Sequence, residues 1–326
     1  MKNKKILFGI VLVSFFLLPA IAQTKAENEQ IGVGEDQGTI TITTEKITFK
    51  IVGGKPHFIW WNGNQSTADE MYKVHFTSIS EFFGDDEVLD SKDELNGISY
   101  NLMGNDWDYE IVEEETEVTI TLILTGLAND VEIQFVIHIY SEDHTVSGTN
   151  QTVTALSEVK IDIVVDNWVF SENAQGLAFK SSLFENQQRH RVRVRNRTGE
   201  EQGNNTRAMI FESEEQGGDV AYYEWATTAD VYNGTDKIST VDVRTAYFEG
   251  PSQGPPGNIT IPGDVTPLSH LWLTYPNYGD SYKLVHDPSI GVYEEAFSSG
   301  VPLYILPVLA AFFASGLFVL FLKRRK

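Results

Sequence analysis

Apolar and polar residues alternate with a period of two along most of the chain. The alternation is clearest at 118–124 and at 131–139, which a short polar turn around Gly126 connects. Successive side chains of a β-strand point to opposite faces of the sheet, so this pattern predicts half-buried strands and, for this pair, a hairpin. Further predicted strands are 40–42, 47–51, 72–76, 159–165, 177–184, 189–197, 207–212, 220–225, 241–248, 268–275 and 281–285. No helical period of useful length occurs between the two hydrophobic ends of the chain, which predicts an all-β domain.

Strands that bury only one face need a second sheet to cover that face. The pattern therefore predicts antiparallel β-sandwich architecture. A polar segment at 141–158 divides the strands into two predicted sandwich units, 35–145 and 155–296. The alternative is one large sandwich in which this segment is only a long loop. The Pro- and Gly-rich stretch 250–263 is predicted to be an exposed loop.

Two hydrophobic segments lie at the ends of the chain. Residues 6–18 follow a lysine-rich start and end at Pro19-Ala20-Ile21-Ala22, which predicts a signal peptide at 1–22, followed by a linker at 23–34. Residues 303–322 contain no charge and are about as long as the ~20 residues that a bilayer core requires, so 302–322 is a predicted transmembrane helix. The basic tail 323–326 is then cytoplasmic, which predicts a single-pass type I protein of the cell membrane with an extracellular domain.

The same tail resembles the three-part sorting signals that archaeal and bacterial surface proteins present to sortase-like transpeptidases. Val301-Pro302, the apolar span and the final basic cluster carry this resemblance. It implies an alternative in which the tail is cleaved after export, although the tighter motif of those signals is not present ahead of the span.

The chain carries a formal net charge of −22. Seven of its 24 basic residues lie in the terminal segments, so the predicted extracellular part has 17 basic against 46 acidic residues, a net charge of −29. With 41% hydrophobic residues, such a chain is too apolar to be a disordered acidic tail. The charge excludes nucleic acid as a partner and favours divalent cations or basic partners.

The chain has no cysteine, which excludes thiol catalysis, cysteine-ligated zinc and blue-copper chemistry. Glycosylation is predicted at the six Asn-x-Ser/Thr acceptors, most of them in expected loops: Asn64, Asn150, Asn196, Asn204, Asn233 and Asn258. Membrane anchor, acceptor sites, acidity and lack of cysteine together look like an archaeal cell-surface protein, a resemblance in topology and composition only.

Arginines occupy every second position of one predicted strand: Arg189, Arg191, Arg193, Arg195 and Arg197. The following strand is predicted to pair with it, with Val192 opposite Phe211 and Val194 opposite Met209. This register sets Arg191 opposite Glu212 and Arg189 opposite Glu214, and it gives the other three arginines no acidic neighbour. The arginines form either a solvated strand face or a docking stripe for an anionic glycan or a surface-layer protein.

Six carboxylates occur within ten residues: Asp85, Asp86, Glu87, Asp90, Asp93 and Glu94. Such a loop is either solvated or a calcium site, since Ca²⁺ takes six to eight oxygen ligands, although the spacing is not that of an EF-hand. Structural calcium is therefore the one cofactor that the sequence suggests. Trp60 and Trp61 lie on opposite faces of a strand, so one of them is either an exposed platform for sugars or proteins, or is covered by another part of the chain.

Neither a Gly-x-Ser-x-Gly elbow nor a His-Glu-x-x-His helix is present, and the seven histidines are scattered without zinc-site spacing. No catalytic residue can be assigned from the sequence. The sequence favours a binding or scaffolding protein at the cell surface, acting in surface-layer association, adhesion or ligand recognition. The alternative is an extracellular carbohydrate-active hydrolase that uses a pair of carboxylates.

Overall fold

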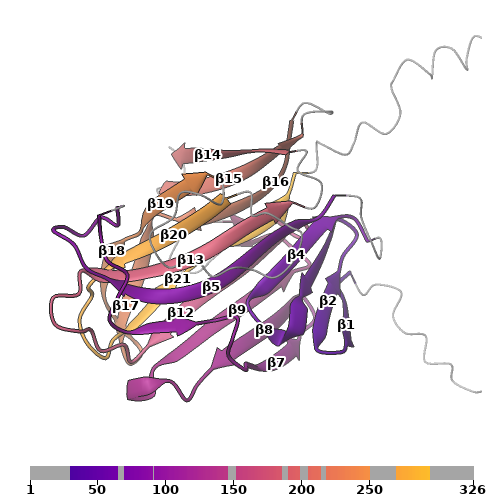
Figure 1. Ribbon diagram of the computed structural model, residues 1–326. Coiled ribbons are helices and arrows are strands. Elements are labelled where there is room, and N and C mark those ends of the chain that lie inside the picture. The colour runs from indigo at the N-terminus through magenta and orange to yellow at the C-terminus, as the bar shows by residue number, and fades with distance from the viewer. Residues whose placement is uncertain are drawn as a thin grey trace, which may run out of the picture.

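The computed structural model describes residues 30–64, 70–90, 92–145, 152–185, 190–198, 205–213, 218–249 and 269–293. Within these ranges the protein consists of antiparallel β-strands and two short 3₁₀-helices, η1 (Val52–Gly54) and η2 (Ala128–Asp130) (Figure 1). This confirms the predicted all-β, antiparallel class. None of the helices in the described ranges is long and apolar enough to cross a membrane. The predicted signal peptide, transmembrane helix and basic tail lie outside these ranges.

Most of the strands form two sheets. The first sheet has the order β1 (Gly32–Asp36), β2 (Thr39–Thr43), β3 (Ile47–Ile51), β4 (His57–Asn62), β5 (Tyr72–Phe82), β13 (Gly176–Glu185), β20 (Ser269–Pro276) and β19 (Arg244–Glu249), and β6 (Ser99–Asn101) also pairs with β5. The second has the order β14 (His190–Thr198), β15 (Asn205–Ser213), β16 (Gly218–Ala226), β22 (Ser289–Val292), β12 (Glu158–Asp166), β21 (Lys283–His286), β17 (Thr228–Asn233) and β18 (Asp236–Asp242).

Three more strands extend the second sheet from the edge of β12 that lies opposite β21 and β22. They are β9 (Glu132–Tyr140), β8 (Glu117–Leu124) and β7 (Asp108–Glu113), and β8 and β9 are the predicted hairpin. A separate two-stranded pair consists of β10 (His144–Thr145) and β11 (Thr152–Val153). The first strand, β1, begins inside the segment predicted as a linker.

The two sheets share a core of aliphatic and aromatic side chains. Phe135 on β9 of the second sheet lies at its centre, with ring centroids 6.0 Å from Phe58, 4.9 Å from Phe76 and 5.9 Å from Phe179. These three partners come from β4, β5 and β13 of the first sheet. Tilted and edge-on rings at such distances pack favourably beyond the area they bury.

Strands from both sides of the polar segment 141–158 pair within each sheet. In the first sheet β5 pairs with β13, and in the second sheet β9 pairs with β12 along almost their whole length. One continuous core cluster contains residues from both halves of the chain. The described strands therefore have the arrangement of one large sandwich, the alternative to two units divided at this segment.

The predicted strand 241–248 is two strands that belong to different sheets. β18 ends at Asp242 in the second sheet, and β19 begins at Arg244 in the first. Val243 between them is 3% exposed, and its N–H donates to the carbonyl of Thr227. The chain thus turns a corner of the sandwich at a buried apolar residue, which a period-two pattern does not reveal.

A buried carboxylate joins three separate segments at one end of the core. Glu81 on β5 is fully buried, and its Oε1 accepts hydrogen bonds from the indole N–H of Trp168 at 3.1 Å and from the backbone N–H of Ser171 at 2.9 Å. Its Oε2 accepts a bond from the backbone N–H of Ile98 at 2.9 Å. A buried charge is tolerated when donors surround it in this way.

We expect Glu81→Ala to lower the free energy of unfolding by about 3–5 kcal/mol, because one buried and two partly buried donors lose their acceptor at once. Glu81→Gln keeps a carbonyl oxygen and should cost less. Urea unfolding followed by tryptophan fluorescence measures both, and Glu110→Ala on the exposed face of β7 serves as the control. A loss below about 1 kcal/mol for Glu81→Ala would contradict this role.

Candidate functional site

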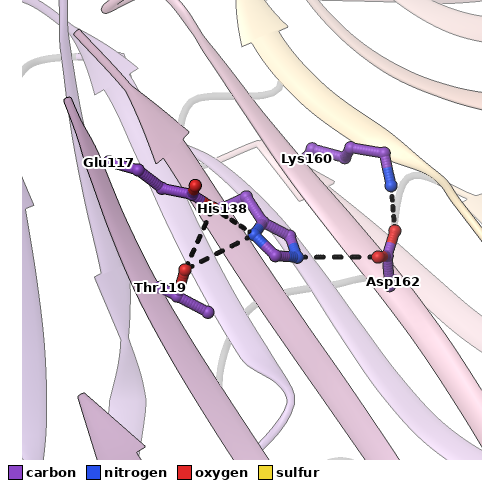
Figure 2. Close-up of polar contacts among 5 residues, drawn as sticks. All are labelled: Glu117, Thr119, His138, Lys160 and Asp162. Atoms are coloured by element: carbon purple, nitrogen blue, oxygen red, sulfur yellow. Dashed lines mark hydrogen bonds and ion pairs between the residues drawn. The ribbon is translucent and has the colours of Figure 1, made fainter. Parts of the chain in front are cut away.

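Five polar side chains gather on the outer face of the second sheet, where β8, β9 and β12 lie side by side (Figure 2). On β9 the odd-numbered residues from Ile133 to Ile139 are buried in the core, so His138 faces away from it. The strand register places Thr119 opposite His138, and His138 opposite Lys160. Glu117 and Asp162 lie on the same face, two residues along from Thr119 and Lys160.

Acidic and basic groups alternate across these strands. The Nδ1 of His138 lies 2.6 Å from Oε1 of Glu117, and its Nε2 lies 3.5 Å from Oδ2 of Asp162. On the far side of Asp162, Oδ1 forms an ion pair with the ammonium group of Lys160. The hydroxyl of Thr119 donates to Glu117 at 3.0 Å. Both ring nitrogens of His138 therefore have carboxylate partners.

These contacts determine the protonation of the cluster. Burial alone would lower the pKa of His138, but the hydrogen bonds to Asp162 and Glu117 and the charge of Asp162 outweigh it and raise the pKa above the ordinary 6.5. Burial would likewise raise the pKa of Asp162, yet its bonds to His138 and Lys160 lower the pKa below the usual value. The arrangement thus favours an imidazolium held between two carboxylates.

Two aromatic rings continue the row from His138. The ring of Tyr140 is nearly parallel to that of His138 with centroids 6.1 Å apart, and it stacks on exposed His144 at 4.2 Å. Burial, together with the charges of Glu117 and Asp162, raises the pKa of the Tyr140 hydroxyl. The phenol is therefore neutral under physiological conditions and does not add to the charge of the cluster.

The cluster lacks the features of a catalytic site. Its charged groups neutralise one another, and neither nitrogen of His138 is left to take a proton from a substrate. What the geometry does supply is an electrostatic link between three neighbouring strands on the outer face. Its strength depends on the proton held by the histidine.

A cavity of about 360 Å³ lies beside this link, at the turn between β7 and β8. Carboxylates dominate its lining, which includes Glu113, Glu114, Glu115 and Glu142, with Thr116 and Ser141 between them. None of its lining residues is aromatic. The cavity is therefore anionic and provides no platform for stacking a sugar ring.

The comparisons with known proteins do not assign the chain to a family. No family model matches the sequence, and a search of curated proteins finds no match.

The predicted register of the arginine strand is confirmed where the structure describes it. In β14 and β15, Val192 is opposite Phe211, Val194 is opposite Met209, and Arg191 is opposite Glu212. Arg193, Arg195 and Arg197 are opposite Ile210, Ala208 and Thr206, none of which is charged. Arg189 lies outside the described residues. β14 is the terminal strand of its sheet, so it has no second strand neighbour in the described part of the chain.

The predicted calcium ligands occupy the loop that follows β5, and several of them contact the backbone of the same loop. Asp86 accepts a bond from the N–H of Val88 at 2.8 Å, and Asp93 accepts one from the N–H of Asp90 at 2.7 Å. Glu87 lies 3.5 Å from Arg244. Among the described residues no three acidic or histidine groups are placed to hold one metal ion. The calcium hypothesis is untested and stays a prediction.

Both tryptophans of the predicted aromatic platform are buried. Trp60 faces the core, fully buried, and its indole N–H donates to the carbonyl of Gly291 at 3.2 Å. Trp61 on the opposite face is 1% exposed, with the Lys50 ammonium 5.2 Å from its ring centroid. The alternative in which other parts of the protein cover the second ring is therefore the one observed.

The predicted glycan acceptors lie in different structural settings: some are exposed, one is within a strand and the others are outside the described residues. Asn64 and Asn233 are exposed, at the ends of β4 and β17. Asn196 lies within β14, a strand rather than the expected loop. Asn150, Asn204 and Asn258 lie outside the described residues.

The cluster around His138 was not predicted from the sequence. Its five residues belong to three strands, and each is an ordinary polar position of an alternating strand. Correct pairing of β9 with β12 would have revealed it, because the register alone sets His138 opposite Lys160.

We expect the cluster to make stability depend on pH in a specific direction. The folded-state pKa of His138 is raised, so its stabilisation is complete below about pH 6.5 and is lost as pH rises through that raised value. Between pH 5.5 and 9, the unfolding free energy of the wild type should fall relative to that of His138→Gln, with a slope of at most about 1.4 kcal/mol per pH unit. Asp162 stays ionised throughout, because its pKa is lowered.

Urea unfolding at several pH values measures this difference. His144→Gln removes an exposed histidine from the same row and should track the wild type. Parallel curves for the wild type and His138→Gln across the whole range would show that the histidine is not held as an imidazolium.

Proposed function

We propose that this chain is a membrane-anchored extracellular protein whose β-sandwich domain binds or scaffolds at the cell surface. Surface-layer association, adhesion and ligand recognition are the roles of this class. The hydrophobic segments at both ends of the sequence support export and anchoring.

The observation that carries the binding role is the position of the arginine strand. β14 lies at the edge of the second sheet, where its outer backbone groups have no strand partner among the described residues. In this strand Arg193, Arg195 and Arg197 are opposite residues without charge. An edge strand with repeated arginines combines unpaired backbone donors and acceptors with guanidinium groups that bind carboxylates.

The partner proposed for this edge is an anionic glycan of the cell surface, and an acidic surface-layer protein is the other outcome to be tested. The extracellular part is strongly acidic as a whole, so a local concentration of arginines is the part of it suited to an anion. Planar guanidinium groups recognise carboxylates with two parallel hydrogen bonds, which a lysine cannot provide.

The alternative function, a carbohydrate-active hydrolase, has weaker support. Glu158 and Glu224 are one described pair of carboxylates that could act as acid and base, since burial first, and then the charge of Glu224, raises the pKa of Glu158. They are only 6% and 8% exposed. A sugar ring could not reach them in this conformation.

Replacing Arg193, Arg195 and Arg197 with Glu should abolish association with the native cell surface, because the edge would then repel an anionic partner. The melting temperature should change little, since none of the three has an acidic neighbour in register. Sedimentation of tagged protein with purified cell envelopes measures association, and circular dichroism measures melting. Enzymatic removal of envelope glycans, in a separate arm, distinguishes a glycan from an acidic protein as the partner.

Two controls accompany this triple variant. Replacing the same residues with Lys keeps the charge but removes bidentate contacts, and should weaken association only partly. Replacing Lys92 and Lys237, which are exposed and lie in other parts of the fold, with Glu makes the net charge more negative by four units, against six for the triple variant, and so tests most of the effect of net charge. Normal association of the Arg→Glu variant would contradict the proposed binding edge.

Anchoring at the outer surface has its own test. Protease added to intact cells should digest the sandwich domain, and deletion of 302–326 should release that domain into the medium, because the proposed helix anchors it to the membrane. Immunoblotting of cells and medium measures both. Full protection from protease in intact cells, with digestion after lysis, would place the domain inside and refute the proposal.

A further inference from the structure

Two histidines face each other on the outer side of the first sheet. His57 on β4 and His75 on β5 are direct partners across the strands, and their ring centroids are 3.6 Å apart at an interplanar angle of 65°. On both strands the neighbouring residues Phe58, Val74 and Phe76 are buried in the core. The two imidazoles therefore lie on the face opposite the core, on adjacent strands of one sheet.

Neither ring has a hydrogen-bond partner at its Nε2 atom, although both of these atoms are buried. A buried polar nitrogen without a partner costs about 1–3 kcal/mol, and native proteins contain few such atoms. Here two of them belong to adjacent, touching side chains. Two buried nitrogens without partners at the same place require a physical explanation. A bound ion is one that accounts for both atoms together.

The protonation of the pair suits a metal ligand. Burial first, and then the charge of Lys73, lowers the pKa of His57 to about 4. Burial, His57 and Lys73 lower the pKa of His75 to about 3. Both rings are therefore neutral near pH 7, and neutral imidazole is the form that coordinates metal ions.

The surrounding strands add further neutral donors in the same transverse row. Ser182 on β13 is opposite His75, and His270 on β20 is opposite Ser182, with its Nδ1 3.0 Å from the serine hydroxyl. His270 is two strands away from His75. Because neighbouring strands lie about 4.8 Å apart, these two histidines are too far apart to share an ion held by bonds of about 2.0–2.1 Å. The site proper consists of the two adjacent histidines.

We propose that His57 and His75 form a binding site for a divalent transition-metal ion, with one ring nitrogen from each imidazole as ligand. Imidazole nitrogens without carboxylates favour Zn²⁺, Cu²⁺ or Ni²⁺ over Ca²⁺ and Mg²⁺, which require oxygen ligands. Two protein ligands leave the remaining coordination positions to water or to a small ligand. This site is separate from the arginine strand and from the His138 cluster.

The test is calorimetric titration of the untagged full-length chain in detergent with ZnCl₂ at pH 7.5. One ion should bind per chain, and MgCl₂ and CaCl₂ should not compete for it. His57→Gln and His75→Gln should each weaken Zn²⁺ binding by more than about 10-fold, because each removes one of two ligands. His144→Gln removes an exposed imidazole elsewhere and should leave the affinity unchanged.

A second variant keeps both histidines and so does not depend on how the sheet tolerates their loss. Lys73→Gln removes the cation that acts on both imidazoles, and should tighten Zn²⁺ binding because the ion no longer meets this positive charge. Circular dichroism confirms that each variant is folded. No binding to the wild type, wild-type affinity in either histidine variant, or unchanged affinity in Lys73→Gln would each overturn the proposed site.

Discussion

One shared layer of apolar side chains determines where every other feature of this protein can lie. Phe135 from the second sheet packs against Phe58, Phe76 and Phe179 from the first, and the same core continues through both halves of the chain. Because alternate residues of each strand are used for this layer, polar chemistry is confined to the outer faces, the loops and the sheet edges. Glu81 is one exception, and three N–H donors surround its buried carboxylate.

The outer faces show how the same residue type acquires opposite properties from its neighbours. His138 lies between two carboxylates, and its pKa is raised despite burial. His57 and His75 lie against each other near Lys73, and their pKa values are lowered, with burial as the main cause. The first environment holds a proton and links strands, whereas the second leaves two neutral rings. At His138 the carboxylate partners outweigh burial, whereas at His57 and His75 burial dominates and the charge of Lys73 adds to it.

The sequence predicted those features that depend on local periodicity. The hairpin of β8 and β9 and the register of β14 on β15 are confirmed, because apolar alternation specifies which residues must face the core. It did not predict features that depend on pairing between distant strands. His57 and His75 are 18 positions apart in the sequence and appear unrelated there, and the sequence left open whether Trp61, which is buried, is covered or exposed. The corner at Val243 was missed because a strand that changes sheets keeps its alternation.

The last described strand is also the one that completes the second sheet. β22 lies between β16 and β12, and the carbonyl of Gly291 on it accepts the indole N–H of Trp60 from the opposite sheet. Gly291 has no side chain, and the Tyr222 hydroxyl lies where a Cβ atom would be, so β16 can approach closely only at a glycine. Until residues 289–292 are in place, β16 and the first residues of β12, Glu158–Lys160, each lack a strand partner on one edge. The second sheet can therefore close only when the chain is available through residue 292.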